Sequence, residues 1–229
     1  MGAVRTWSLA RTYLVEREAL FERIRSGRDL PALVLRMTGV AALLSALYGF
    51  TVGLYAGGWQ ILYNVVKLPL LFLATLALCV LALYMLNSLA GARLSLLQTA
   101  AVVLTAIVAT TMLLASLAPP LGFLMLTSLR DYHFVVFINL LVGCLVGAGG
   151  VRFAFQAAAA AHVDDIVRAR CLRIMRIWLL IYGAVGLQMV WIFRPFFRQT
   201  DVFIRPLTEQ GNAFEAFFRL LLLVIAKLV

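Results

Sequence analysis

The sequence is poor in charged residues and rich in apolar ones. Only 13% of its 229 residues are charged, about half of the share that soluble domains carry. Because 64% of the residues are hydrophobic and the mean hydropathy is +0.99, too few polar side chains are present to coat a surface exposed to water. This shortage excludes a soluble globular protein, and the apolar content excludes a disordered chain.

Cysteine is also scarce, and the sequence lacks catalytic motifs. Cys79, Cys144 and Cys171 are too far apart for a CxxC motif or a zinc-binding spacing, so neither a disulfide framework nor a metal cluster is indicated. No P-loop, G-x-S-x-G, H-E-x-x-H or dinucleotide-binding glycine motif occurs. We therefore predict no enzyme activity and no cofactor.

Two histidines lie beside aspartates in a way that resembles the halves of a split metal site. His133 follows Asp131 closely, and His162 precedes Asp164 and Asp165. A membrane span predicted between the two groups would separate them by roughly 43 Å, at about 1.5 Å per helical residue. One site cannot contain both, and we predict no metal binding from this pattern.

Apolar runs make up most of the chain. Each run is about 20 residues long, which is enough to cross a bilayer as a helix. We predict an all-α, polytopic membrane helical bundle with transmembrane helices at residues 37–56, 65–89, 96–117, 134–155 and 174–193. The expected organisation is an amphipathic N-terminal segment (1–36), a five-span membrane domain (37–197) and a C-terminal loop with an interfacial helix (198–229).

Prolines fall near the predicted ends of these spans. Pro69 lies in the first turns of the second span, where a missing N–H is least costly, and Pro119 with Pro120 closes the third. The apolar stretch 121–129 is too short to cross the bilayer and is predicted to be interfacial or re-entrant. Residues 156–175 are predicted to continue the fourth span as an Ala-rich cytoplasmic helix.

The distribution of basic residues predicts the orientation of the bundle. With a cytoplasmic N-terminus, thirteen of the 20 Lys and Arg residues lie in cytoplasmic segments and seven lie elsewhere, as the positive-inside rule requires. This clustering at span ends also accounts for the net charge of +10 without a nucleic-acid partner. The preference for Arg over Lys and the absence of an N-x-[ST] sequon favour a bacterial inner membrane.

Both ends of the chain carry amphipathic segments. Residues 6–26 place apolar side chains on one arc of a helical projection, with Arg17 inside that arc. This pattern predicts a helix lying on the membrane surface, or alternatively one packed on the cytoplasmic loops or on a second subunit. Asn212 with Glu215 resembles a capping box and predicts a second interfacial helix. The predicted membrane-surface anchors are Trp7, Leu14, Arg17, Phe21, Trp191, Arg194 and Phe217.

Several polar side chains fall within or beside the spans, where such a group is costly unless it has a partner or a water-filled path. They are Asn64, Lys67, Asn87, Gln98, Asn139, Arg152 and Gln188. Lys67, Arg152 and Arg194 lie near span ends, which predicts snorkelling to lipid phosphate. Asn139 and Gln188 lie deeper, where interhelical hydrogen bonds are expected. The lack of acidic residues at depth disfavours proton- or cation-coupled transport.

Small residues recur at helical spacing in two of the spans. The first span carries Ser45, Gly49, Gly53 and Gly57, and the fourth carries Gly143 and Gly147. Such small-xxx-small stripes let another helix approach backbone to backbone. We expect packing within one subunit, with a dimer or partner interface as the alternative.

A basic N-terminus followed by five closely spaced spans resembles the Yip-type family of small five-span membrane proteins. The segments Asn64–Leu70 and Gly186–Phe196 are also similar to those of uncharacterised bacterial multi-pass membrane proteins. The resemblance implies a five-span fold and a non-enzymatic protein. In eukaryotes the Yip family is implicated in vesicle traffic and binds lipid-anchored small GTPases, but no residue of this sequence matches a GTPase contact.

Packing and anchoring features thus outnumber chemical ones. We predict a non-enzymatic integral membrane scaffold or an accessory subunit of a membrane protein assembly. The alternative is a small-solute channel or transporter lined by Asn64, Asn87, Gln98, Asn139 and Gln188. The expected partners are membrane lipids, including anionic lipids, and another membrane protein or a second copy of the chain.

Overall fold

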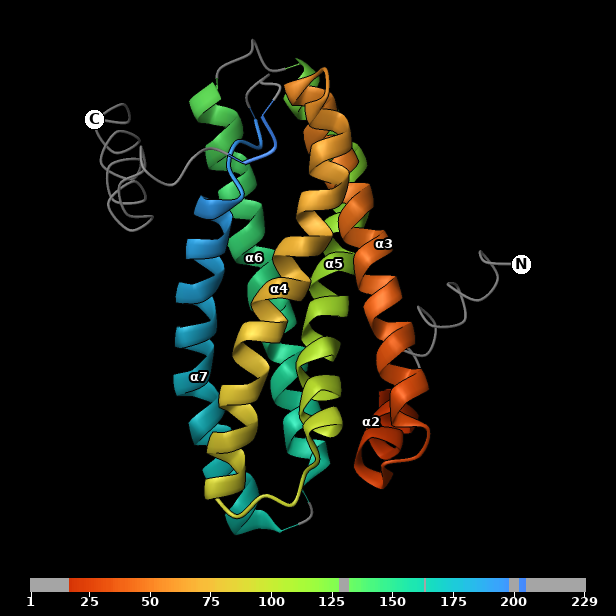
Figure 1. Ribbon diagram of the computed structural model, residues 1–229, viewed down its shortest axis with the longest axis vertical. Helices are drawn as coiled ribbons and strands as arrows, with labels where there is room; N and C mark the ends of the chain where they lie inside the picture. The colour runs from red at the N-terminus through yellow and green to blue at the C-terminus, as the bar shows by residue number, and fades with distance from the viewer. Residues whose placement is uncertain (1–16, 128–131, 163, 198–201, 205–229) are drawn as a thin grey trace.

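The computed structural model describes residues 17–127, 132–162, 164–197 and 202–204. This part of the chain is all-helical, and its elements are α2 (Arg17–Ser26), α3 (Leu30–Ala56), α4 (Gln60–Leu89), α5 (Leu96–Thr127), α6 (Tyr132–Ala161) and α7 (Asp165–Ile192). The five long helices are each long and apolar enough to cross a membrane. Figure 1 shows them side by side in one bundle, with α2 at the end where α4 connects to α5. The predicted all-α, multi-pass fold is confirmed.

Helix α5 forms the centre of the bundle. In its most apolar stretch 56% of the residues are buried, against 28% in α3, 33% in α4, 17% in α6 and 11% in α7. Its threonines Thr99, Thr105 and Thr111 donate their hydroxyl hydrogens to carbonyls of the same helix or of the residue before it. Small, internally satisfied side chains let α3, α4 and α6 pack closely around α5. Helices α6 and α7 consequently keep long faces open to the outside.

Helix α5 also continues further than its prolines suggested. It runs through Pro119 and Pro120 to Thr127, so the prediction that these prolines end the span is wrong, and so is the interfacial or re-entrant assignment that followed from it. Leu121 and Met125 are buried in a core cluster with residues of α3. In lipid a backbone must satisfy its polar groups internally, and a helix that lacks two N–H donors still does so better than a loop.

Helices α3 and α4 begin several residues before the predicted spans. Helix α3 starts at Leu30 and α4 at Gln60, whereas the spans were predicted from residues 37 and 65. Pro69 therefore lies inside α4 instead of in its first turns. In α4 the added residues include Gln60 and Asn64, polar side chains that a hydropathy pattern excludes but that the folded bundle buries. In α3 the added residues include the buried Leu30 and Leu33, and the exposed Arg36 is the charged residue that bounded the predicted span.

Residues 156–175 do not form one continuous helix, contrary to the prediction. Helix α6 ends at Ala161 and α7 begins at Asp165. The Asp164 carboxylate accepts hydrogen bonds from the backbone N–H groups of Ile166 and Val167 at 2.8 and 3.3 Å. This N-cap satisfies donors that the first turn of a helix leaves unpaired, and it therefore favours a new helix here.

Helix α2 packs against the bundle. Leu20 and Ile24 are buried in the main core, and Phe21 packs against that core. The side-chain amide of Gln98 donates to the backbone carbonyls of Ile24 and Arg25 at 3.0 and 3.1 Å, which pairs carbonyls at the end of α2. The described part of the N-terminal segment thus follows the packed alternative and lies against α5 and α6.

Some of the predicted features lie outside the described residues. These are residues 6–16 with the anchors Trp7 and Leu14, Asp131 beside His133, the C-terminal interfacial helix with Phe217, and the side chain of Arg17.

Candidate functional site

The first turns of α4 carry a polar face made of Gln60, Asn64 and Lys67. Spacings of four and three residues place these side chains on one side of the helix. All three have an exposure of 0%. An ammonium group with no exposed surface does not reach lipid phosphate, so the predicted snorkelling of Lys67 is wrong.

Uncharged groups surround the Lys67 ammonium. Its Nζ donates hydrogen bonds to the Pro195 carbonyl at 2.7 Å and to Gln60 Oε1 at 3.4 Å. The ring centroids of Tyr63, Phe196 and Phe203 lie 5.9, 5.6 and 5.3 Å from Nζ. Aromatic faces within about 6 Å attract a cation through their quadrupoles, and more strongly where water is excluded. Carbonyl oxygens and rings together compensate the buried charge.

The polar face of α4 holds the segment that follows α7. We call this segment, residues 195–197 and 202–204, the strap. Besides the Lys67 bond, Asn64 Nδ2 donates to the Phe196 carbonyl at 2.8 Å, and Gln60 Nε2 donates to the Val202 carbonyl at 3.2 Å. In Figure 1 the strap is the blue segment at the end of the bundle opposite α2. Non-helical carbonyls in an apolar environment need donors, and α4 supplies three of them.

Two of the predicted surface anchors contact each other at the end of α7. Arg194 donates from Nε to the Trp191 carbonyl at 3.1 Å, and its guanidinium carbon lies 3.2 Å from the centroid of the Trp191 ring. Arg152 on α6 is exposed, and Gln188 on α7 is half-buried. The strap is therefore preceded by a stacked Arg and Trp pair that closes the last helix.

Asn139 forms the interhelical hydrogen bond that its depth predicted. Its Oδ1 accepts from the Tyr48 hydroxyl at 2.6 Å, which joins α6 to α3. Its Nδ2 donates to the Val135 carbonyl at 2.8 Å and lies 3.2 Å from Met125 Sδ. The prediction for Asn139 is confirmed, and the side chain serves helix packing.

Replacing Tyr48 by phenylalanine should lower the free energy of unfolding by about 1 kcal/mol, the size typical of interhelical hydrogen bonds in membranes. Thermal unfolding in detergent would measure the loss. Tyr84→Phe is the control, because the Tyr84 hydroxyl makes no hydrogen bond within the described part of the chain. Equal stability of the two variants would show that the Tyr48 bond contributes nothing.

The two glycine stripes differ in their surroundings. A Cβ on Gly49 would collide with the Asn64 carbonyl oxygen, and one on Gly53 would lie 2.6 Å from Ile61 Cα. Ser45 is buried, and Gly57 ends α3 with a φ of 77°. The first stripe is therefore an internal contact between α3 and α4, as expected. A Cβ on Gly143 or Gly147 of α6 would meet nothing within 4 Å, so the second stripe is open.

The remaining polar residues lie at the end of the bundle where α2 packs. Gln98 and Ser95 form a reciprocal capping box that starts α5, with distances of 2.8 and 3.2 Å. Asn87, in the last turn of α4, is buried, and its Oδ1 has no hydrogen-bond partner in the described residues. The polar residues predicted as one lining are thus divided between opposite ends of the bundle.

Sequence reasoning missed Gln60 and the strap residues. Gln60 stands four residues before Asn64 and seven before Lys67, a helical spacing that could have revealed the shared face. The predicted span began at residue 65, however, and excluded it. No sequence signal links Pro195 or Phe203 to α4, because that contact joins distant parts of the chain.

Comparisons with protein-family models, with curated proteins and with solved structures give no match for this chain. The function is therefore inferred from the contacts within the structure alone. The polar face of α4 donates hydrogen bonds to backbone carbonyls of its own chain, and these bonds hold the strap against the bundle.

Proposed function

We propose that this protein is a non-enzymatic integral membrane scaffold or accessory subunit of a membrane protein assembly. Its membrane would be a bacterial inner membrane, with the N-terminus in the cytoplasm as the distribution of basic residues favours. The five-span organisation and the basic N-terminus support a Yip-like protein. The partners would be another membrane protein or a second copy of the chain, together with lipids that include anionic ones.

The polar side chains favour this role over a small-solute channel or transporter. A solute path needs polar groups that are free to face it. Instead, Asn64 holds the strap, Gln98 pairs carbonyls of α2, and Asn139 joins α6 to α3. These hydrogen bonds use Asn64 Nδ2, Gln98 Nε2 and both polar atoms of Asn139, groups that the alternative function would need, although Asn64 Oδ1 is buried without a partner in the described residues.

The open glycine pair on α6 is the observation that most supports this proposal. Gly143 and Gly147 leave open space where a Cβ would project, whereas Gly150 on the same helix meets Thr110 and the Ala106 carbonyl of α5. Two small residues one turn apart on an unpacked helix face allow a second helix to approach closely. The stripe that is used inside the chain on α3 is available on α6 for a partner.

Replacing Gly143 and Gly147 by leucine should weaken assembly at least tenfold, because two large side chains would hold a partner helix away. Native mass spectrometry from mild detergent would measure the fraction of chain in complexes. Gly39→Leu is the matched control, since Gly39 also has no atom within 4 Å of a Cβ and lies on the different helix α3. Complexes that survive the α6 substitutions unchanged would refute this face as the interface.

A further inference from the structure

A small cavity lies at the end of the bundle where α2 packs. Its volume is about 10 Å³, and its lining includes Asn87, His162, Cys171 and Met175. A cavity of about 10–15 Å³ holds one water molecule or one metal ion of comparable size. The residues come from α4, from the end of α6 and from α7, so a single bound atom would join three elements.

His162 presents a free nitrogen lone pair in this region. Its Nδ1 lies 2.8 Å from the Ala158 carbonyl oxygen. Because a carbonyl only accepts hydrogen bonds, Nδ1 carries the hydrogen and Nε2 keeps its lone pair in the neutral ring. Nε2 is buried without a partner in the described residues, and the side chain is 9% exposed. Histidines that bind metals are oriented in this way, with the other ring nitrogen donating to a carbonyl.

Two sulfur-containing side chains line the cavity together with His162, and sulfur is a soft metal ligand. Cys171 and Met175 are one helical turn apart on α7, both are 2% exposed, and both line the cavity. Asn87 adds an oxygen, because its Oδ1 is buried and has no partner in the described residues. Thiolate and thioether sulfurs select copper(I), and imidazole also suits copper.

The charge balance favours a monovalent ion. The other lining residues are mostly apolar, among them Leu83, Leu94 and Val102, and no carboxylate lines the cavity. A divalent ion with one thiolate would keep an uncompensated charge, which is costly in an apolar environment. A monovalent ion with the Cys171 thiolate is neutral overall. Within the described residues no group of three or more His, Cys, Asp or Glu side chains could hold a metal ion, so the typical zinc donor set is absent there.

We propose that this cavity binds one copper(I) ion through His162 Nε2, Cys171 Sγ and Met175 Sδ, with Asn87 Oδ1 as a weaker fourth donor. On binding, the Cys171 thiol loses its proton to solvent and its sulfur bonds to the metal. The oxidation state of copper does not change.

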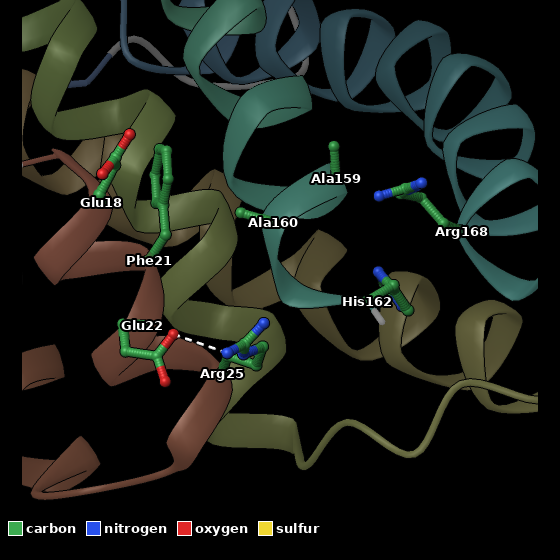
Figure 2. Close-up of a pocket in the computed structure, with 8 residues that line it drawn as sticks. All are labelled: Glu18, Phe21, Glu22, Arg25, Ala159, Ala160, His162 and Arg168. Atoms are coloured by element: carbon green, nitrogen blue, oxygen red, sulfur yellow. Dashed lines mark hydrogen bonds and ion pairs between the residues drawn. The ribbon is translucent and has the colours of Figure 1, made fainter. Parts of the chain in front are cut away.

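An open groove beside the cavity offers a route for the ion. It has a volume of about 350 Å³ and is lined by Glu18 and Glu22 of α2, by Arg168 of α7 and by His162 itself. Figure 2 shows His162 at the end of α6, with the ion pair of Glu22 and Arg25 on one side and Arg168 on the other. His162 lines both spaces, so the groove and the cavity are adjacent at this residue.

The test is an anaerobic titration of the full-length protein in detergent with copper(I), using bicinchoninate as the competing chelator. One equivalent per chain should be retained. Cys171→Ser should weaken binding at least tenfold, and Met175→Leu should weaken it less. Cys144→Ser is the matched control, because Cys144 is exposed on α6 away from the cavity lining, and its affinity should equal that of the unchanged protein.

A second measurement needs no substitution and therefore does not depend on whether a variant folds. X-ray absorption of the copper-loaded, unchanged protein should show two sulfur donors and one or two nitrogen or oxygen donors, and silver(I) should raise its thermal unfolding temperature. No retained copper in the folded protein, equal retention of zinc(II), loss of binding in Cys144→Ser instead of Cys171→Ser, or a high-resolution density with only a water in the cavity would each overturn the proposal.

Discussion

Replacing Gly49 by alanine is expected to lower the free energy of unfolding by about 2–3 kcal/mol, the upper range for overpacking a closely packed site. The new Cβ would collide with the Asn64 carbonyl oxygen and lie 2.9 Å from the carbonyl carbon. Backbone atoms cannot rotate out of the way as a flexible side chain can. Helices α3 and α4 would therefore have to separate, and the polar face of α4 would move with them.

Unfolding of Gly49→Ala in detergent, followed by tryptophan fluorescence, would measure this loss. Gly39→Ala is the matched control on the same helix, because its Cβ would meet nothing within 4 Å. There the substitution should be neutral or stabilising by up to about 1 kcal/mol, since alanine restricts the unfolded chain more than glycine does. Equal effects at the two positions would contradict the close contact of α3 with α4.

Replacing Lys67 by methionine is expected to release the strap. The change leaves the Pro195 carbonyl and Gln60 Oε1 without the ammonium donor, and each unpaired buried acceptor costs about 1–3 kcal/mol. It also removes the cation from the three aromatic rings around it. Hydrogen exchange of the strap amides should accelerate at least tenfold, which corresponds to about 1.4 kcal/mol.

The control for this experiment is Arg152→Met. Arg152 is an exposed cation on α6, so the substitution removes a charge of the same sign without touching the strap. Amide exchange in the strap should then match that of the unchanged protein. Exchange that stays slow in Lys67→Met would mean that Asn64 and Gln60 hold the strap without the lysine.

Local sequence patterns predicted the bundle well but misjudged its polar residues. Hydropathy located each of the five long helices of the described residues, because a run of apolar residues of bilayer length has one stable arrangement in lipid. The same reasoning ended a helix at Pro119 that continues to Thr127. It counted the cost of two missing N–H donors but could not count the burial of Leu121 and Met125, which favours the longer helix. It also placed Lys67 at the lipid surface, whereas the strap encloses the side chain.

The copper site illustrates the same limit. His162, Cys171 and Met175 are separated by nine and four residues in the sequence, a spacing that matches no metal motif. The break between α6 and α7, set by the Asp164 cap, turns His162 and the sulfur atoms of α7 toward one cavity. Asn87 lines the same cavity but belongs to α4, which ends at Leu89, more than 70 residues before His162 in the sequence.

Composition and hydropathy were therefore sufficient to predict that the described part of the chain is all-helical and holds five helices long and apolar enough to cross a membrane, because the transfer of apolar segments into lipid depends on each segment alone. The partners of Lys67, the internal use of the α3 glycines, the open face of α6 and the cavity at His162 could be read only from the folded chain. Each of these depends on atoms that lie far apart in sequence, and the energy of a buried polar group is determined by whichever neighbours the fold places beside it.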